Sequence, residues 1–480
     1  MMSKLYSTLF LSCALFALSG CQTLDIADKF IPEATDATPE TVASPEGAWV
    51  QPAPSDVPEN DWIGTFDDPV LTALIDEAME TNPTIRLSQA SYEASLNGVT
   101  LSDAALLPQI NGSASISRSE SLNEIIPGQT GFNSGVNASW EIDLWGRLRD
   151  AVTSSELSAE AALANYAGTR LAIAGQVAQV WINILQGKLL TDLSVDDVDT
   201  QARALRLTTR RFEGGLTDSS DVRLSRSALA NAESLQSSRQ QALASTKRLM
   251  ETLLRRYPAE AISASNDLPE LPALTGTGTP ANLLLRRPDI LAAERNLRAA
   301  GFNVDEARKN LLPQLTLSGG TNSGAGALSD FFDIDAIAAN IVAGLSQPLF
   351  TGGRLKATIK IQEALLRQQS EAYVNLVLNA YLEVENALNA ERSLAIQEEA
   401  LRISLEESRK GEERIELRYT EGLATILQLL DAQTRRLSAE AALINARANR
   451  LSNRISLHVA LGGGFETDSV LRTVQSGSSP

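Results

Sequence analysis

The sequence predicts a mainly α-helical fold in which long helical hairpins and pairs of strands are repeated by an internal tandem duplication. Three observations predict it. Similar motifs recur in the same order in both halves of the 480-residue chain, each half holds a proline-free run of 67 residues, and each half holds two runs of alternating polar and apolar residues. With 43% hydrophobic and 21% charged residues, the chain can bury a large core.

The duplication is visible in four pairs of motifs. The first two pairs lie 205 residues apart (288 − 83 = 205), and the last two lie 207 residues apart (354 − 147 = 207). Four matches in order, with a drift of only two residues, indicate that one unit was copied. The pairs are residues 82–85 with 287–290, 106–110 with 311–315, 144–148 with 351–355, and 211–216 with 418–423.

Residues 1–20 read as an export signal that is removed. An apolar run from Leu5 to Leu18 follows Lys4 and is too short to cross a bilayer as a helix. The stretch Leu18-Ser19-Gly20-Cys21 resembles the lipobox of bacterial lipoproteins, which implies cleavage before Cys21 and an N-acyl and S-diacylglycerol lipid on that residue. The alternative is an ordinary signal peptide with a chance cysteine. Cys13 leaves with the signal, so the mature chain would keep one thiol and no disulfide.

Two proline-rich stretches divide the rest of the chain. Residues 21–60 carry six prolines and are expected to form an extended tether from the lipid anchor. Residues 258–280 are expected to be the linker between the two copies. The expected repeats are therefore residues 61–257 and 281–462, followed by a flexible tail at 463–480.

Each copy contains two runs with the period of two that is typical of a strand with one apolar and one polar face. The expected strands lie at about 109–118, 133–143, 314–322 and 340–350. Each has about the ten residues that a tilted transmembrane strand needs. A half-exposed soluble sheet is the alternative interpretation. Four strands in lipid leave open edges with unpaired backbone groups, so several copies are expected to share one sheet, which has twelve strands if there are three copies.

The proline-free runs, residues 147–213 and 354–420, predict helices about 100 Å long at 1.5 Å per residue. Glycine turns follow, and return helices are expected from Asp221 and Ile426. The expected hairpin tips are residues 213–221, with Gly214 and Gly215, and residues 420–426, with Gly422. In the last helix, leucines and isoleucines recur every seven residues, which predicts a coiled-coil seam with His458 packed in it.

Composition argues against several classes of function. A formal charge of −18 repels nucleic acid, so no nucleic-acid partner is expected. One histidine, no thiol beyond Cys21, and the lack of a phosphate-binding glycine loop or clustered metal ligands argue against an enzyme, a cofactor or a metal site. A soluble periplasmic adaptor with long hairpins is a further alternative, but it leaves the duplicated strands unexplained.

The motifs resemble those of the TolC-like outer-membrane factors of tripartite efflux systems, within the lipid-anchored branch that serves resistance-nodulation-division (RND) pumps. The resemblance covers nearly all of residues 60–462 and rests on the paired Leu-Leu-Pro-Gln motifs, residues 347–354, and residues 418–433. It implies a homotrimer whose long helical hairpins form a helical barrel continuous with a shared 12-stranded β-barrel, four strands from each chain.

The resemblance also implies a location and a function. The chain is expected in the outer membrane of a Gram-negative bacterium, lipid-anchored, with most of its length in the periplasm. It would work with a periplasmic membrane-fusion adaptor and an inner-membrane RND pump and conduct small molecules passively. The alternative is an exit duct for type I protein secretion or for heavy metals, although only Met79 and Met250 would remain to line a path for soft metals.

The family closes its tunnel at the periplasmic tip, and some of those positions carry over. Asp221 matches an aspartate that meets a tyrosine of the neighbouring hairpin, and Tyr419 matches that tyrosine. Asp431 matches an aspartate of a narrow, cation-sensitive ring. Gln428 departs from the family pattern, because some members have a second ring aspartate there. As an alternative to a role in the gate, Asp218 and Asp221 would simply cap the return helix.

Overall fold

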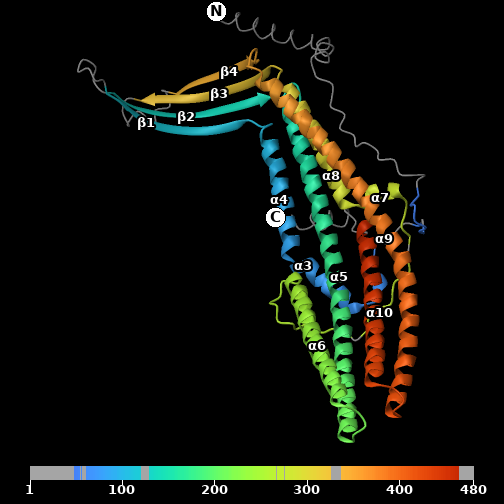
Figure 1. The fold of residues 1–480 in the computed structure, drawn as a ribbon. Helices are drawn as coiled ribbons and strands as arrows, with labels where there is room; N and C mark the ends of the chain where they lie inside the picture. The colour runs from blue at the N-terminus through green and yellow to red at the C-terminus, as the bar shows by residue number, and fades with distance from the viewer. Residues whose placement is uncertain are drawn as a thin grey trace, which may run out of the picture. The chain divides into compact units, whose positions relative to one another are not determined.

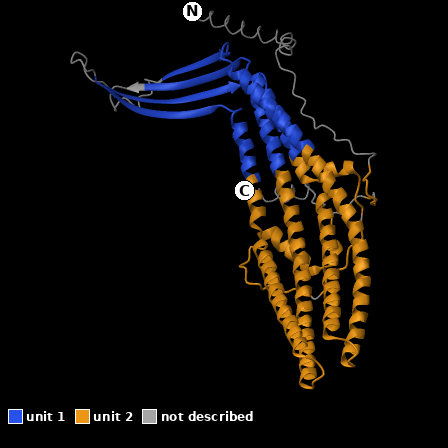
Figure 2. Ribbon diagram, in the orientation of Figure 1, with its two compact units in different colours: residues 1–40, 92–162, 293–374 blue, residues 41–91, 163–292, 375–480 orange. Residues whose placement is uncertain are grey.

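The computed structural model describes residues 48–54, 56, 61–120, 129–265, 267–274, 276–325 and 337–463. The expected signal, Cys21 and residues 464–480 lie outside these ranges. The chain divides into two compact units, shown in Figure 2. The first contains Tyr92–Ala162 and Ala293–Val374, and the second contains Leu163–Ala292 together with the described parts of Thr41–Ser91 and Asn375–Pro480.

The first unit holds one antiparallel sheet with the strand order β1-β2-β3-β4 (Figure 1). The two central strands come from different copies of the repeat, and Trp140 of β2 lies opposite Leu317 of β3. β1 and β4 therefore form the two edges. The strands are β1 Gln109–Ser119, β2 Gln129–Ile142, β3 Gln314–Ala325 and β4 Ile337–Ser346.

The strands differ from their expected bounds mainly at their ends. β2 begins at Gln129 and ends at Ile142, and β3 continues to Ala325. β4 ends at Ser346, so the expectation that it reaches residue 350 is wrong. Pro348 explains the difference, because proline has no N–H to donate to a neighbouring strand.

Helices make up most of the rest of the described chain (Figure 1). Both long helices, α5 and α9, have 67 residues and the bounds that the proline-free runs predict. In the described part of the chain, no helix is both long and apolar enough to span a membrane. The helices are α3 Pro69–Thr81, α4 Pro83–Ala104, α5 Arg147–Glu213, α6 Ser219–Leu253, α7 Pro280–Arg286, α8 Pro288–Lys309, α9 Arg354–Thr420 and α10 Ile426–Ala460, with a 3-10 turn η2 at Gly64–Phe66.

The middle of α5 supplies much of the core of the second unit. Trp181, Ile182 and Leu185 are completely buried, and the Trp181 indole N–H donates to the Asp68 carboxylate at 2.7 Å. A Cβ added at Gly175 would lie 2.7 Å from a methyl carbon of Val459 in α10. The absence of a side chain at Gly175 therefore lets α5 and α10 pack closely.

His458 lies in this core, as the coiled-coil seam predicts. It is buried and stacks on Trp62 with 5.7 Å between the ring centroids. Burial, together with the charge of Arg454, lowers the pKa of His458 to about 4. The imidazole is therefore neutral at ordinary pH.

The duplication extends to single contacts. The Asn82 side chain donates to the Leu253 carbonyl at 2.8 Å, and Arg287 donates to the Ala460 carbonyl at 3.3 Å. Asn82 and Arg287 are equivalent positions of the two copies, and so are the two carbonyls. In both repeats the residue before a helix-starting proline thus binds the end of a return helix, although the residue type has changed.

The described end of the expected tether is attached to the second unit. The Glu385 carboxylate of α9 accepts the backbone N–H of Val50 at 2.7 Å and that of Gln51 at 3.2 Å. Thr277, in the linker between the repeats, donates its backbone N–H to the Pro54 carbonyl at 2.8 Å. This part of the tether is therefore held by hydrogen bonds to α9 and to the linker.

Candidate functional site

The two helical hairpins of the second unit turn in the same way. After α5, the Leu216 N–H donates to the Arg211 carbonyl at 2.8 Å, and after α9 the Leu423 N–H donates to the Arg418 carbonyl at 2.7 Å. Gly215 and Gly422 occupy the left-handed position of these turns, with φ of 72° and 79°. This closure favours glycine, which adopts positive φ without steric cost. Of the tip glycines that the sequence singles out, Gly214 is not among those with positive φ.

The return helix α6 begins at Ser219, two residues before the expected Asp221, because Asp218 caps it. The Asp218 carboxylate accepts the backbone N–H of Ser220 at 2.7 Å and that of Asp221 at 3.3 Å. Hydrogen bonds from Ser220 and Asp221 also lower the pKa of Asp218. Asp218 therefore does what the capping alternative expects, whereas the Asp221 carboxylate accepts a hydrogen bond from the Thr217 hydroxyl.

The second return helix has a different cap. Thr425 and Gln428 form a capping box, in which the Gln428 amide oxygen accepts the Thr425 N–H at 3.0 Å and the Thr425 hydroxyl accepts the Gln428 N–H at 3.3 Å. An aspartate at position 428 would have a shorter side chain than glutamine. Gln428 thus has a local structural role that accounts for its residue type.

Tyr419 is buried at the tip and contacts Ile426 and Leu429. Its hydroxyl lies 3.0 Å from that of Thr208 near the end of α5. The Arg211 guanidinium lies over the tyrosine ring, 4.9 Å from its centre, and donates to the Tyr419 carbonyl at 2.8 Å. Tyr419 therefore joins the two hairpins of one chain.

Within this single chain, Tyr419 forms no direct hydrogen bond with the Asp221 carboxylate, and the meeting of these two residues between neighbouring hairpins stays a prediction. The Ser225 hydroxyl donates to the Thr208 oxygen at 3.2 Å or to the Asp221 carbonyl at 3.0 Å. Tyr419 and Asp221 are thus linked through two hydroxyl groups and a backbone carbonyl, with the Asp221 carboxylate turned to Thr217. Phe212, the counterpart of Tyr419 in the first repeat, has no hydroxyl and is exposed, so the first repeat has no equivalent of this bond.

Asp431 lies on the exposed face of α10, one turn after the capping box. Its carboxylate accepts the Arg435 Nε–H at 2.8 Å, and this pair raises the pKa of Arg435. Both side chains are largely exposed, so water screens the attraction. Within one chain, then, Asp431 is already partnered by a cation of its own helix.

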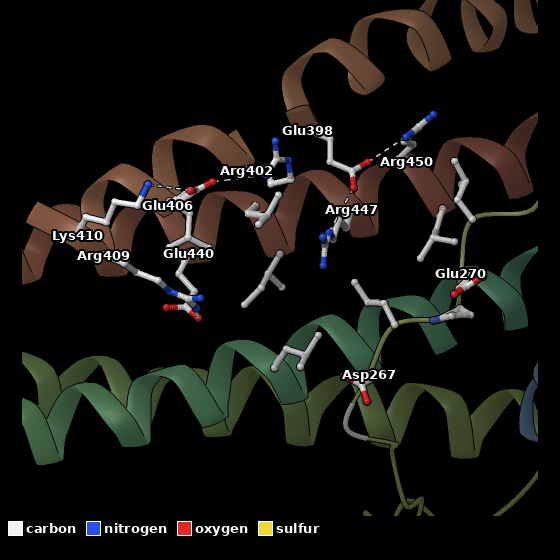
Figure 3. Close-up of a pocket in the computed structure, with 18 of the residues that line it drawn as sticks. Asp267, Glu270, Glu398, Arg402, Glu406, Arg409, Lys410, Glu440, Arg447 and Arg450 are labelled. Carbon is white, nitrogen blue, oxygen red and sulfur yellow. Dashed lines mark hydrogen bonds and ion pairs between the residues drawn. The ribbon is translucent and has the colours of Figure 1, made fainter. Parts of the chain in front are cut away.

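Ion pairs connect α9 to α10 above the tip (Figure 3). Glu398 accepts from Arg447 at 3.2 Å and from Arg450 at 3.0 Å, and Arg409 donates to Glu440 at 2.6 Å. These residues line a pocket of about 1000 Å³ that linker residues 267–271 also border. Since each pair joins fixed positions on the two helices, the pairs favour one axial register of α9 against α10.

The sheet of the first unit exposes apolar side chains. Ile116 of β1 and Ile341 of β4 are 71% and 82% exposed in the single chain, although isoleucine is usually buried in soluble proteins. Next to Ile341, Asn340 is polar and Val342 is exposed, so the alternation is imperfect. A sheet with exposed apolar residues and two open edges suits a lipid environment shared with other strands.

The comparisons with known proteins agree with this architecture. The family model for outer membrane efflux proteins matches twice, at residues 74–254 and 279–463. The pyoverdine export outer membrane protein OpmQ of Pseudomonas putida is 30% identical over 453 residues, which are 91% of this chain and 95% of OpmQ. The toluene efflux pump outer membrane protein TtgF of Pseudomonas putida is 28% identical over 468 residues, covering 96% of this chain and 97% of TtgF.

Among solved structures, the outer-membrane channel OprN aligns with a TM-score of 0.79 and 26% identity, covering 89% of this chain and 99% of OprN. The double match of the family model corresponds to the two copies seen in the sequence and in the fold. The chain therefore belongs to the outer membrane efflux protein family.

Proposed function

We propose that the chain is the outer-membrane channel subunit of a tripartite efflux pump and conducts small molecules passively across that membrane. The observation that carries the proposal is the β1–β4 sheet, with two open edges and exposed apolar side chains, in a chain that also forms long helical hairpins. Relatives named for pyoverdine export and toluene efflux support it.

The open edges support a homotrimer. In lipid, an unpaired strand edge leaves N–H and C=O groups without partners, and each such group costs several kcal/mol. Pairing β4 of one copy with β1 of the next removes both edges, and three copies provide twelve strands. The α5–α6 and α9–α10 hairpins of the three copies then supply the helical duct.

The partners and the location are part of the same proposal. A periplasmic adaptor and an inner-membrane RND pump would deliver the cargo and the energy, and the channel itself would carry out no chemistry and need no cofactor. The lipid on Cys21 would anchor the chain to the outer membrane of a Gram-negative cell, with most of the protein in the periplasm. Asp221, Tyr419 and Asp431 would act near the periplasmic entrance. Three copies of Asp431 around an axis would attract cations in place of Arg435, whose exposed pair with Asp431 is screened by water.

Reconstitution in planar bilayers tests the function. Purified protein is expected to give stepwise, ohmic currents and to migrate as a trimer when it is not heated. A cell that lacks the gene is expected to retain a fluorescent efflux substrate, and the wild-type gene should restore its export. Purified protein that gives no conductance, together with unchanged retention in the cell, would refute the proposal.

Metabolic labelling with palmitate tests the anchor. Wild-type protein is expected to take up the label, and Cys21→Ser is expected to lose it. Cys13→Ser is the matched control, because Cys13 lies in the proposed signal, which would be removed. Continued labelling of the Cys21→Ser variant would rule out the proposed anchor.

A further inference from the structure

A second pocket lies between the two hairpins of the second unit, close to the tip. It has a volume of about 350 Å³. Its walls come from the end of α5, the end of α9 and the start of α10. The lining residues are Thr200, Arg203, Ala204, Leu207, Arg409, Glu412, Glu413, Glu416, Leu429, Gln433 and Arg436.

Gln433 has an unused hydrogen-bond acceptor in this pocket. The residue is only 3% exposed, and its amide oxygen has no hydrogen-bond partner among the described residues. A buried, unpaired polar atom costs about 1–3 kcal/mol, so such atoms normally have a partner. The orphaned oxygen therefore points to a ligand that donates a hydrogen bond.

The cations that line the pocket are already partnered. Arg203 pairs with Asp199, and Figure 3 shows Arg409 beside Glu440. Arg436 pairs with Glu412 and, at 2.9 Å, with Glu440. No arginine of the pocket is thus left without a carboxylate, and an anion would have to break one of these pairs to bind.

Two carboxylates that line the pocket are unpaired. Glu413 and Glu416 form no ion pair or hydrogen bond of their side chains with other described residues of the chain. The pKa of Glu412 is raised, mainly by burial. The charges of Glu416 and Glu440 also raise this pKa, whereas Arg436 lowers it. The two unpaired carboxylates and the orphaned Gln433 oxygen are therefore hydrogen-bond acceptors, and two of these three groups are negative; the Gln433 amide nitrogen adds an uncommitted donor.

We infer that this pocket binds an organic cation, a guanidinium or ammonium group carried on an aliphatic stem. Gln433, Glu413 and Glu416 supply the acceptors for the cationic head. Ala204, Leu207 and Leu429 supply apolar surface for the stem. Because the walls come from both hairpins, a bound cation would tie α5 to α9 and α10 near the tip.

Calorimetric titration of the detergent-solubilised, dialysed protein with agmatine tests the inference. Agmatine carries both a guanidinium and an ammonium group on a short stem. Saturable binding with one site per chain is expected. Removing one charge-assisted acceptor, as in Glu413→Gln or Glu416→Gln, should weaken binding roughly tenfold. The matched control is Glu421→Gln, which removes the same charge from an exposed tip residue that does not line the pocket.

Gln433→Met separates binding from folding. Methionine has a similar length and no amide oxygen, so it should weaken agmatine binding roughly tenfold while the thermal midpoint stays the same or rises, since the unpaired oxygen is gone. No saturable binding to the wild type would overturn the inference. Equal affinity in all of these variants, or saturable binding of inorganic phosphate in place of agmatine, would also overturn it.

A second probe distinguishes the source of the cation. N-acetylarginine methylamide presents the guanidinium as a protein side chain does, without a free ammonium group. Tighter binding of this probe than of agmatine would assign the site to an arginine of a partner protein, and tighter binding of agmatine would assign it to a free solute. The inference rests on the pocket alone, so it and the proposed conduction can fail separately.

Discussion

The Tyr419 hydroxyl lies 3.0 Å from the Thr208 hydroxyl, and 211 residues of sequence separate the two side chains. This bond joins the end of α9 to the end of α5 inside a small apolar cluster that includes Ile426 and Leu429. The Tyr419 side chain, in the α9–α10 hairpin, therefore bonds to the α5–α6 hairpin of its own chain. The two hairpin ends are therefore joined by contacts within one chain.

Replacing Tyr419 should loosen this tip in two steps. Tyr419→Phe removes only the hydroxyl and should lower the free energy of opening the tip by about 1 kcal/mol. The loss is small because the Thr208 hydroxyl still donates to the Ala204 carbonyl. Tyr419→Ala also empties the cluster and should cost about 3–5 kcal/mol. Hydrogen exchange of the amides at residues 205–212 measures both effects. Phe212→Ala, at the equivalent but exposed position, is the control, and an equal loss of protection there would contradict the argument.

The conductance of reconstituted channels tests whether this bond contributes to the gate. Tyr419→Phe combined with Thr208→Val removes both hydroxyls with little change in volume. If the bond holds the entrance narrow, conductance should rise in this double variant and more than in Asp221→Asn, whose carboxylate contacts Thr217. A larger rise in Asp221→Asn would show that the Asp221 carboxylate, and not the bond between Tyr419 and Thr208, holds the entrance narrow.

Asp218 allows capping to be separated from charge. Asp218→Asn keeps an oxygen that can accept the N–H groups of Ser220 and Asp221, so exchange of these two amides should stay close to wild type. Asp218→Ala removes the acceptor, and their exchange should be about fivefold faster. The conductance of Asp218→Asn should remain unchanged. A clear change would mean that the charge, rather than the cap, is what the channel uses.

Arg255 occupies a position that suits glycine. It follows α6 with φ of 59°, and its N–H donates to the Thr252 carbonyl at 3.1 Å. Its counterpart after α10 is Gly462, with φ of 88°. Since a left-handed conformation costs a residue with a Cβ about 1–2 kcal/mol, Arg255→Gly should stabilise the protein by about 1 kcal/mol.

Chemical unfolding measures this effect, with Gly462→Ala as the reciprocal variant. A Cβ at position 462 would lie 2.8 Å from the Arg286 carbonyl oxygen. Gly462→Ala should therefore lower the free energy of unfolding by more than Arg255→Gly raises it. A lower free energy of unfolding in Arg255→Gly would contradict this expectation. It would mean that contacts of the Arg255 side chain stabilise the protein by more than the left-handed backbone costs.

His458 should make stability depend on pH. Its pKa is lowered to about 4 in the folded chain by burial and by Arg454, whereas an unfolded histidine titrates near pH 6.5. Between these pH values the unfolded chain binds a proton that the folded chain does not. The contribution of neutral, buried His458 to the free energy of unfolding is therefore fully present above about pH 6.5. It is lost as the pH falls toward 4, by up to about 3 kcal/mol.

His458→Phe keeps an aromatic ring against Trp62 but cannot titrate. The difference in unfolding free energy between wild type and this variant should therefore shift by about 3 kcal/mol between pH 7 and pH 4, with carboxylate titrations common to both proteins cancelling. A difference that does not change with pH would show that His458 titrates normally in the folded chain.

The sequence by itself determined the features that depend on near neighbours. The bounds of α5 and α9 follow from proline-free runs that end at glycine turns, and the strands follow from alternation that starts after Leu-Leu-Pro. The duplication predicts that contacts recur in both copies, and the bonds that Asn82 and Arg287 donate to the ends of α6 and α10 are one such pair. The proline, glycine and alternation signals each lie in or next to the element that they specify, and the duplication applies them to both copies.

Only the tertiary structure decided which groups meet across long separations in the sequence. The partner of Tyr419, the capping box of Gln428 and the unpaired oxygen of Gln433 depend on how the helices pack and on competition between several acceptors. A residue type shows that an aspartate can cap a helix or contact a tyrosine, but not which of the two it does. That choice follows from the distances that packing sets, because hydrogen bonds weaken steeply with small changes in geometry.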